Sequence, residues 1–468
     1  MGTKEIRIGE EYSHKKAITY GFAIFTTQAI YQAFTFLVFT FYFAVVGINV
    51  VLISIGFIIW SIWNSVNDPL IGYMSDRTNS RWGRRLPYIF ISILPLALVV
   101  FLLFTPPSAI GIDGESTNFV YFLIIILIFE LFYTIYTLNI VSLFPEIFIT
   151  QKERTTANNI RSIFLIVGLI MAFILPSLFI SDYSDPNAIN EYQIFGLALG
   201  GIFIAGGLIF ILFGPRGREE FKEEYRGVSS FFNSMKTCLK NKSYRWFIPA
   251  ALANWFVLGI LPTIFPLYGK FVLGIKNSLL LSLLLGLTFI SAVLFITLVW
   301  RPVAQKIGLR KAWIASMTVW IITLIPILFI ENIVMGYIVF FLMGMGLAGS
   351  IYFLDLVLSD IIDEDEVNYG KRREGGYYGV SAFITRLSTA LVFLAISLVF
   401  TYVGWALYEP EKATVQVIMG LKILMVIFPI IALGIGIICM YKYPLDDKYL
   451  SEIKEQLDKI HIKKRERI

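Results

Sequence analysis

The stretch SLLLSLLLGLTFISAVLFITLVW at residues 278–300 contains no charged side chain and no proline. A helix needs about 20 consecutive apolar residues to cross ~30 Å of hydrocarbon. In lipid only helices and closed barrels satisfy the backbone polar groups, and this run is too long and too uniformly apolar for a barrel strand. The stretch therefore predicts a membrane-spanning helix.

Apolar runs of similar length recur on both sides of this stretch. The chain has 468 residues, 57% hydrophobic and only 15% charged, with a mean hydropathy of +0.74. Soluble domains carry roughly 25% charged residues. The predicted spans are 18–45, 50–74, 87–105, 118–143, 160–181, 193–213, 246–269, 278–300, 311–330, 333–359, 377–403 and 414–440.

Composition also excludes several other classes of protein. The net charge of +6 is not gathered on a soluble domain, which argues against nucleic-acid binding. Cys238 and Cys439 lie far apart without metal-ligand spacing, so we predict two free thiols and no cofactor. The first residues lack the apolar segment and small-residue cleavage site of a signal peptide. His14 and His461 lie in the tails and the spans hold no catalytic constellation, so we expect no enzyme activity.

The basic residues predict how the chain is oriented. If the spans alternate in direction, almost all Lys and Arg outside them fall on one side, while Lys270, Lys276 and Lys412 fall on the other. Positive charge is retained in the cytoplasm. We therefore expect both termini in the cytoplasm and a multi-pass protein of the cell membrane, functioning as a monomer among lipid.

A long basic segment, 214–245, divides the spans into two sets of six. DPLIGYMSDR (68–77) follows the second span, and RPVAQKIGLR (301–310) follows the eighth, its equivalent in the second set. Two related halves are typical of the major facilitator fold, which binds solutes between them near mid-membrane. We predict an all-α fold with a cytoplasmic N-terminus (1–17), an N-terminal bundle (18–213), a cytoplasmic linker (214–245), a C-terminal bundle (246–441) and a charged tail (442–468).

Six ionisable residues fall within or at the ends of these spans: Asp68, Glu130, Arg161, Asp355, Arg386 and Lys422. A charge inside a span costs at least about 2.5–3.5 kcal/mol on insertion scales, so each needs a partner or a function. We expect Lys422 to extend its amine toward the membrane surface.

Asp68 lies in SVNDPLIGYMSD, with Asn64 one helical turn before it and Pro69 directly after it. A carboxylate beside amide oxygens is a donor set that suits hard cations such as Na⁺. The alternative is a structural pair between Asp68 and an arginine.

Glu130 shares a helix face with Thr134 and Thr137. It can accept a proton or a substrate hydroxyl, or it can pair permanently with Arg386 or Arg161. Arg386 cannot relay protons, because its guanidinium stays charged. It can bind a substrate in bidentate fashion or serve as counter-ion to Asp68 or Glu130.

Two segments identify a family. WNSVNDPLIGYMSDRTNSRWGRRLPY (63–88) and DIIDEDEVNYGKRREGGYY (360–378) closely resemble signatures of the glycoside–pentoside–hexuronide cation symporters, the family of the melibiose permease. YGFAIF (20–25) and SLFPEI (142–147) are weaker matches. The resemblance implies a cation site at Asn64, Asn67, Asp68 and Thr134. It also implies that Arg386 links the cation and solute sites and that Arg161 lies near the solute.

The sequence departs from this family at three acidic positions. The two acids that bind sugar hydroxyls in the family fall on Gln28 and Thr137, and one acid of the cation site falls on Asn64. Glu130 can replace one of the two sugar-binding acids. The expected substrate-binding residues are thus Gln28, Glu130, Thr137, Arg161 and Arg386, and the coupling cation is Na⁺ or H⁺.

Three hypotheses follow. The first is cation-coupled symport of a sugar-like or glycoside-like solute by alternating access. The second is symport of a lysolipid or another amphiphile, which the lost acids would suit. The third is a non-transporting sensor or scaffold. Transport requires a cytoplasmic gate, for which the candidates are Asp76, Arg77, Arg81, Arg84, Arg85, Glu146, Arg154, Asp355, Asp363, Arg372, Arg373 and Glu374.

Overall fold

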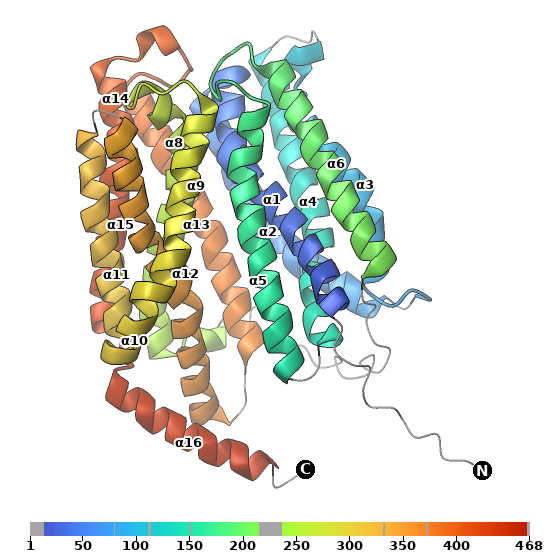
Figure 1. The fold of residues 1–468 in the computed structure, drawn as a ribbon, viewed down its shortest axis with the longest axis vertical. Helices are drawn as coiled ribbons and strands as arrows, with labels where there is room; N and C mark the ends of the chain where they lie inside the picture. Colours follow the sequence, from blue (N-terminus) through green and yellow to red (C-terminus); the bar gives the residue numbers. More distant parts are fainter. Residues whose placement is uncertain are drawn as a thin grey trace.

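The computed structural model describes residues 14–78, 80–110, 114–148, 151–214, 236–330, 333–370 and 373–465. The described chain is helical throughout, and the long helices run side by side as two sets (Figure 1). We call the set before residue 214 the N-terminal half and the set from residue 242 to residue 442 the C-terminal half.

Six helices form the N-terminal half. They are α1 (His14–Thr40), which continues as a π-helical turn over Phe41–Val45, α2 (Val50–Arg77), α3 (Leu86–Leu102), α4 (Glu115–Ile147), α5 (Gln151–Ile174), followed by a 3₁₀ turn over Leu175–Leu178, and α6 (Ile189–Phe213).

The C-terminal half repeats this plan with more interruptions. Its helices are α8 (Lys242–Phe271), α9 (Ser278–Phe295), which continues through a π-helical turn (Ile296–Trp300) into α10 (Arg301–Ile307), α11 (Leu309–Leu324), which ends in a 3₁₀ turn (Ile325–Phe329), α12 (Ile333–Tyr369), α13 (Glu374–Tyr402), and α14 (Val415–Lys422), which continues through a π-helical turn (Ile423–Ile427) into α15 (Phe428–Lys442).

The predicted spans agree with this architecture. Eleven helices of the described chain are long and apolar enough to cross a membrane, and Leu86–Leu102 is a shorter apolar helix at the place of the third span. The helices extend beyond two of the predicted spans, 278–300 and 333–359, so the loops that follow are shorter than expected. Residues 301–307 continue the preceding helix until Gly308, whose φ of 78° ends it, and α12 extends to Tyr369.

The two ends of the helix bundle differ. We call the lower end in Figure 1 the basic face, which carries the start of α1, the loop after α2 and the final helix α16 (Asp447–Arg465). The other end, the opposite face, carries the loops after α1, α5 and α13. The charged tail thus forms the surface helix that its sequence allowed. Ile453 and Leu457 are buried, and Lys454 lies 3.8 Å from Asp360 of α12.

Hydrogen bonds join the halves at the opposite face. Lys270 of α8 forms an ion pair with Asp182 at 2.8 Å. Tyr183 and Ser282 lie 2.6 Å apart through their hydroxyls. The Val50 amide donates to the Ala406 carbonyl at 2.8 Å. The structure is therefore closed at this face.

The small residues of MGMGLAG (343–349) allow α12 to pack closely on its neighbours. A Cβ at Gly346 would lie 2.3 Å from the Trp320 Cβ and 2.5 Å from its Cα, and one at Gly349 would lie 2.1 Å from the Ser316 Cβ. Both described cysteines are free, as predicted, and burial raises the pKa of the Cys238 thiol to about 11.

We predict that Gly346→Ala destabilises the protein, because the added methyl must displace the Trp320 backbone. Overpacking typically costs about 1–3 kcal/mol. The matched control is Gly434→Ala on α15, where a Cβ meets nothing within 4 Å. Thermal unfolding in detergent should show a lower melting temperature for Gly346→Ala only. Equal melting temperatures for the two variants would contradict the close packing of α11 on α12.

Candidate functional site

An ion pair joins the two halves within the bundle. Arg386 of α13 donates from Nη2 to Asp68 Oδ2 of α2 at 2.9 Å. Both side chains are largely shielded, with 20% and 29% of their surface exposed. Ser61, two turns before Asp68, donates a short hydrogen bond to the Arg386 carbonyl. In this conformation Arg386 is therefore paired with Asp68.

The second oxygen of Asp68 faces the N-terminal half. Thr134 of α4 donates to Asp68 Oδ1 at 3.0 Å, and its hydroxyl also lies 3.4 Å from Glu130 Oε1. Glu130 is 1% exposed, and its Oε2 has no hydrogen-bond partner. Two carboxylates, one guanidinium and one hydroxyl therefore meet where α2, α4 and α13 converge.

Two buried amides precede Asp68 on α2. Asn64 and Asn67 are both 0% exposed. Asn67 donates from Nδ2 to the Glu130 carbonyl at 3.2 Å, while its Oδ1 has no donor. Neither side-chain atom of Asn64 has a partner. Buried polar groups are normally paired, so these unsatisfied atoms make the region a candidate site.

Aromatic rings form one wall beside the cluster. Tyr31 of α1 stacks on Tyr133 of α4 with ring centroids 5.1 Å apart, and Phe34 stacks on Phe129 at 4.4 Å. Tyr31 interacts electrostatically with Arg386, Glu130 and Asp68. Our sequence analysis did not predict Tyr133. The signal was available, because Phe129 and Tyr133 lie one turn apart and flank Glu130.

Of the remaining predicted substrate residues, Thr137 lies beside the aromatic rings, whereas the contacts of Gln28 and Arg161 are elsewhere. Thr137 lies beside Tyr133 on α4, and Gln28 lies on α1 against Gly168 of α5. Arg161 has its guanidinium 5.6 Å from the ring of Phe144. It interacts with Asp355 of the C-terminal half at longer range than a salt bridge. The structure thus separates Arg161 from the Asp68–Arg386 pair.

The contacts of the predicted gate residues that the structure describes lie mostly within one half, apart from the longer-range interaction of Asp355 with Arg161. Arg373 pairs with Asp365, which raises the pKa of the guanidinium, and Arg154 donates to the Phe148 carbonyl at 2.8 Å. Arg85 is buried beside Ser75, while Arg77 and Arg81 lie over the rings of Tyr73 and Trp82. Arg84 and Asp363 are partly exposed, and Asp355 is exposed. Arg372 and the side chains of Asp76, Glu146 and Glu374 lie outside the described residues.

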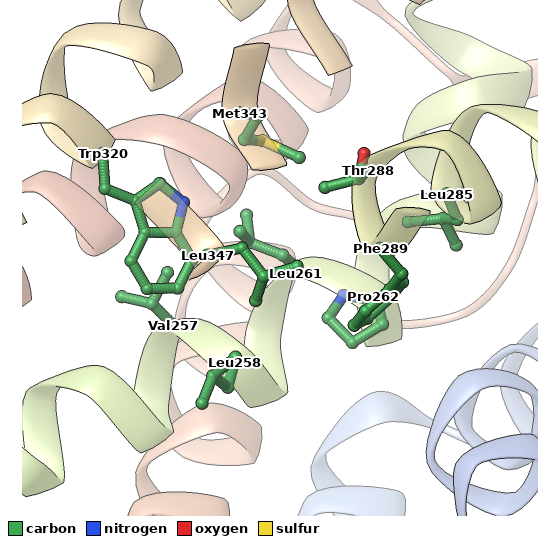
Figure 2. A pocket seen from close by; sticks show the side chains of 10 residues that line it. All are labelled: Val257, Leu258, Leu261, Pro262, Leu285, Thr288, Phe289, Trp320, Met343 and Leu347. Carbon is green, nitrogen blue, oxygen red and sulfur yellow. The ribbon is translucent and has the colours of Figure 1, made fainter. Parts of the chain in front are cut away.

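An apolar pocket lies in the C-terminal half (Figure 2). Helices α8, α9, α11 and α12 provide its lining: Val257, Leu258, Leu261, Pro262, Leu285, Thr288, Phe289, Trp320, Met343 and Leu347. The Thr288 hydroxyl donates to the Phe340 carbonyl. Phe289 also stacks on Phe173 of α5, with centroids 4.9 Å apart. The pocket therefore borders the N-terminal half and offers a solute mainly apolar contacts.

Known proteins resemble this chain along most of its length. The family described as MFS/sugar transport protein matches residues 19–447. An isoprimeverose transporter of Lactiplantibacillus pentosus is 23% identical, covering 90% of this chain and 87% of its own. A sodium-dependent lysophosphatidylcholine symporter of Mus musculus is 22% identical, covering 84% and 79%. The solved structure of the nucleoside transporter NupG aligns with a TM-score of 0.67 at 15% identity, covering 92% and 100%.

We predict that Asp68 and Arg386 are energetically coupled. Asp68→Asn and Arg386→Gln should each lower the melting temperature, because each leaves a shielded charge unpaired. The double variant should be less destabilised than the sum, with a coupling energy of about 1–3 kcal/mol.

The matched control is the cycle for the exposed pair Glu455 and Lys459 on α16, which lie 2.7 Å apart. Its coupling should be much smaller, because solvent screens surface pairs. Strict additivity for Asp68 and Arg386 would show that the pair does not join the halves in solution.

Proposed function

Because this chain belongs to the MFS/sugar transport protein family of cation-coupled symporters, we propose that its solute is a sugar-like or glycoside-like molecule that binds between the halves. The single observation that carries this proposal is the buried cluster of Asn64, Asn67, Asp68, Thr134 and Glu130, which Arg386 connects to the other half. The cation binds within the cluster, and the solute binds beside it.

The geometry supports alternating access between two states. Bonds such as Lys270–Asp182 hold the opposite face closed. If both chain ends are cytoplasmic, as the charge distribution predicts, this conformation is the one closed toward the outside. Rocking of the halves about the central site would break these bonds and close the basic face instead.

Coupling follows from the position of Arg386. It reaches from the C-terminal half to an acid of the N-terminal half, so a change at the cation cluster alters the interaction between the halves. Cation and solute that favour the same conformation raise each other's affinity by the same factor. We infer that a hydroxylated solute contacts Thr137 and the ring of Tyr31 beside the cluster, and that Gln28 and Arg161 contribute to its binding.

The apolar pocket favours a second candidate, an amphiphile such as a lysolipid. Its apolar lining would suit the hydrocarbon part of such a molecule, and an arginine such as Arg161 or Arg386 would suit a phosphate or another polar headgroup. The similarity to a lysophosphatidylcholine symporter is compatible with this candidate. The sensor hypothesis is less favoured, because the cluster retains a buried carboxylate, Glu130, and a largely shielded one, Asp68, that a protein without coupling would not need.

We predict that Asp68→Asn abolishes cation-stimulated uptake in cells while the protein still reaches the membrane. Without its carboxylate partner, Arg386 is free to neutralise Glu130, and the cation has no net charge to bind. Glu455→Gln on the exposed α16 is the control and should transport normally. Unchanged uptake and cation dependence in Asp68→Asn would refute the site.

The two solute classes can be separated with purified protein. We expect glycosides to raise the melting temperature in Na⁺ buffer, or at acidic pH in choline, and lysophosphatidylcholine to have little effect. A comparison at two pH values in NaCl and in choline chloride measures both the solute class and the cation. If lysolipid alone raises the melting temperature, the solute is an amphiphile and the second candidate replaces the first.

A further inference from the structure

The buried charges of the cluster do not balance. Glu130 interacts electrostatically with two other charged side chains, Asp68 and Arg386. The tyrosines that face it are Tyr31 of α1 and, one turn along its own helix, Tyr133. Two carboxylates and one guanidinium leave a net charge of minus one when both acids are ionised. A shielded site of this kind requires one further positive charge.

Asp68 has both oxygens occupied. Its Oδ2 accepts from Arg386 and its Oδ1 accepts from Thr134. An arginine paired with a carboxylate in this way neutralises it, and the pair persists without any added ion. Asp68 is therefore satisfied by the protein itself.

Glu130 is not satisfied in the same way. The Thr134 hydroxyl has one hydrogen, and its shorter contact is with Asp68 at 3.0 Å, against 3.4 Å for Glu130. Oε2 of Glu130 receives no hydrogen bond of normal geometry, although the residue is 1% exposed; the indole of Trp60 lies nearby, but its Nε1 is also unpaired. The unneutralised charge thus resides on Glu130.

The neighbouring groups suit a cation at this acid. The Oδ1 atoms of Asn64 and Asn67 lack donors, and both residues are fully buried. Carboxylate and amide oxygens are the ligands that hard cations prefer. Asn67 is held against α4 by its bond to the Glu130 carbonyl, which keeps its oxygen near this acid.

We propose that Glu130 carries the charge that the coupling cation neutralises, with one monovalent cation bound per chain, and that Asp68 acts as the counter-ion that positions Arg386. This inference rests on the proposed function, which assigns cation binding to the cluster without choosing between its acids. Arg386 interacts with both acids, so a movement of the C-terminal half that transfers the guanidinium toward Glu130 would release the cation.

The test measures cation-dependent melting of the full-length protein in detergent. Sodium chloride is titrated against choline chloride at constant ionic strength, at pH 6 and pH 8. The variants are Glu130→Gln, Glu130→Asp and the control Glu115→Gln, an exposed acid at the end of the same helix. We expect wild type and Glu115→Gln to respond alike, and Glu130→Gln to lose at least about tenfold in apparent cation affinity, equivalent to ~1.4 kcal/mol. Glu130→Asp should respond more weakly than wild type.

A second measurement does not depend on the folding of any variant. Dicyclohexylcarbodiimide, an apolar reagent for carboxyl groups, is applied to wild type, and modified peptides are quantified by mass spectrometry. We expect labelling of Glu130 and its suppression by Na⁺. If the labelling of Glu130 changes with pH but not with Na⁺, the cation is H⁺. This result also supports the proposal.

The outcomes separate this inference from the proposed function. If wild type responds to a cation and Glu130→Gln responds equally, the cation binds elsewhere and the inference about Glu130 is wrong while cation coupling stands. Labelling of Glu130 that neither Na⁺ nor pH alters overturns it in the same way. If wild type responds to neither cation, both the inference and the proposed cation site fail.

Discussion

Charge neutrality inside an apolar bundle is the constraint on which this structure depends. A charged side chain shielded from water is costly unless a partner or a bound ion neutralises it. The chain satisfies this constraint between its halves by placing Arg386 of α13 against Asp68 of α2. Glu130 adds a second acid without adding a base. The net negative charge destabilises the centre of the bundle when no cation is bound. The same charge therefore favours cation binding there.

The position of that imbalance connects it to transport. The pair bridges the halves, whereas the ion pair of Lys270 with Asp182 closes only the opposite face. Ring stacking extends the connection, since Phe57 of α2 stacks on Phe393 of α13 with centroids 3.7 Å apart. When a cation neutralises Glu130 on α4, the effect can thus be transmitted through α2 to its contact with α13. This contact must change when the halves rock.

The fold was largely predictable from the sequence, because long apolar runs admit only helices in lipid and their charged flanks mark where the helices end. Helix faces were predictable too, as the contact of Glu130 with Thr134 one turn later shows. The choice of partner was not. Asp68 could pair with several arginines, and only the packing of α13 on α2 selects Arg386. Tyr133 was missed because its local signal, an aromatic ring one turn after Phe129, is shared by many ring pairs in this chain, and its role depends on stacking with Tyr31.

The central claim is that the cluster carries one uncompensated negative charge and therefore binds one monovalent cation. Equilibrium dialysis of the purified protein with radioactive sodium, paired with measurement of protons released or taken up on binding, tests it most directly. Our account predicts a saturating stoichiometry of one cation per chain, whether as sodium bound or as one proton exchanged. Saturation at two cations per chain, or no specific binding of either, would contradict it.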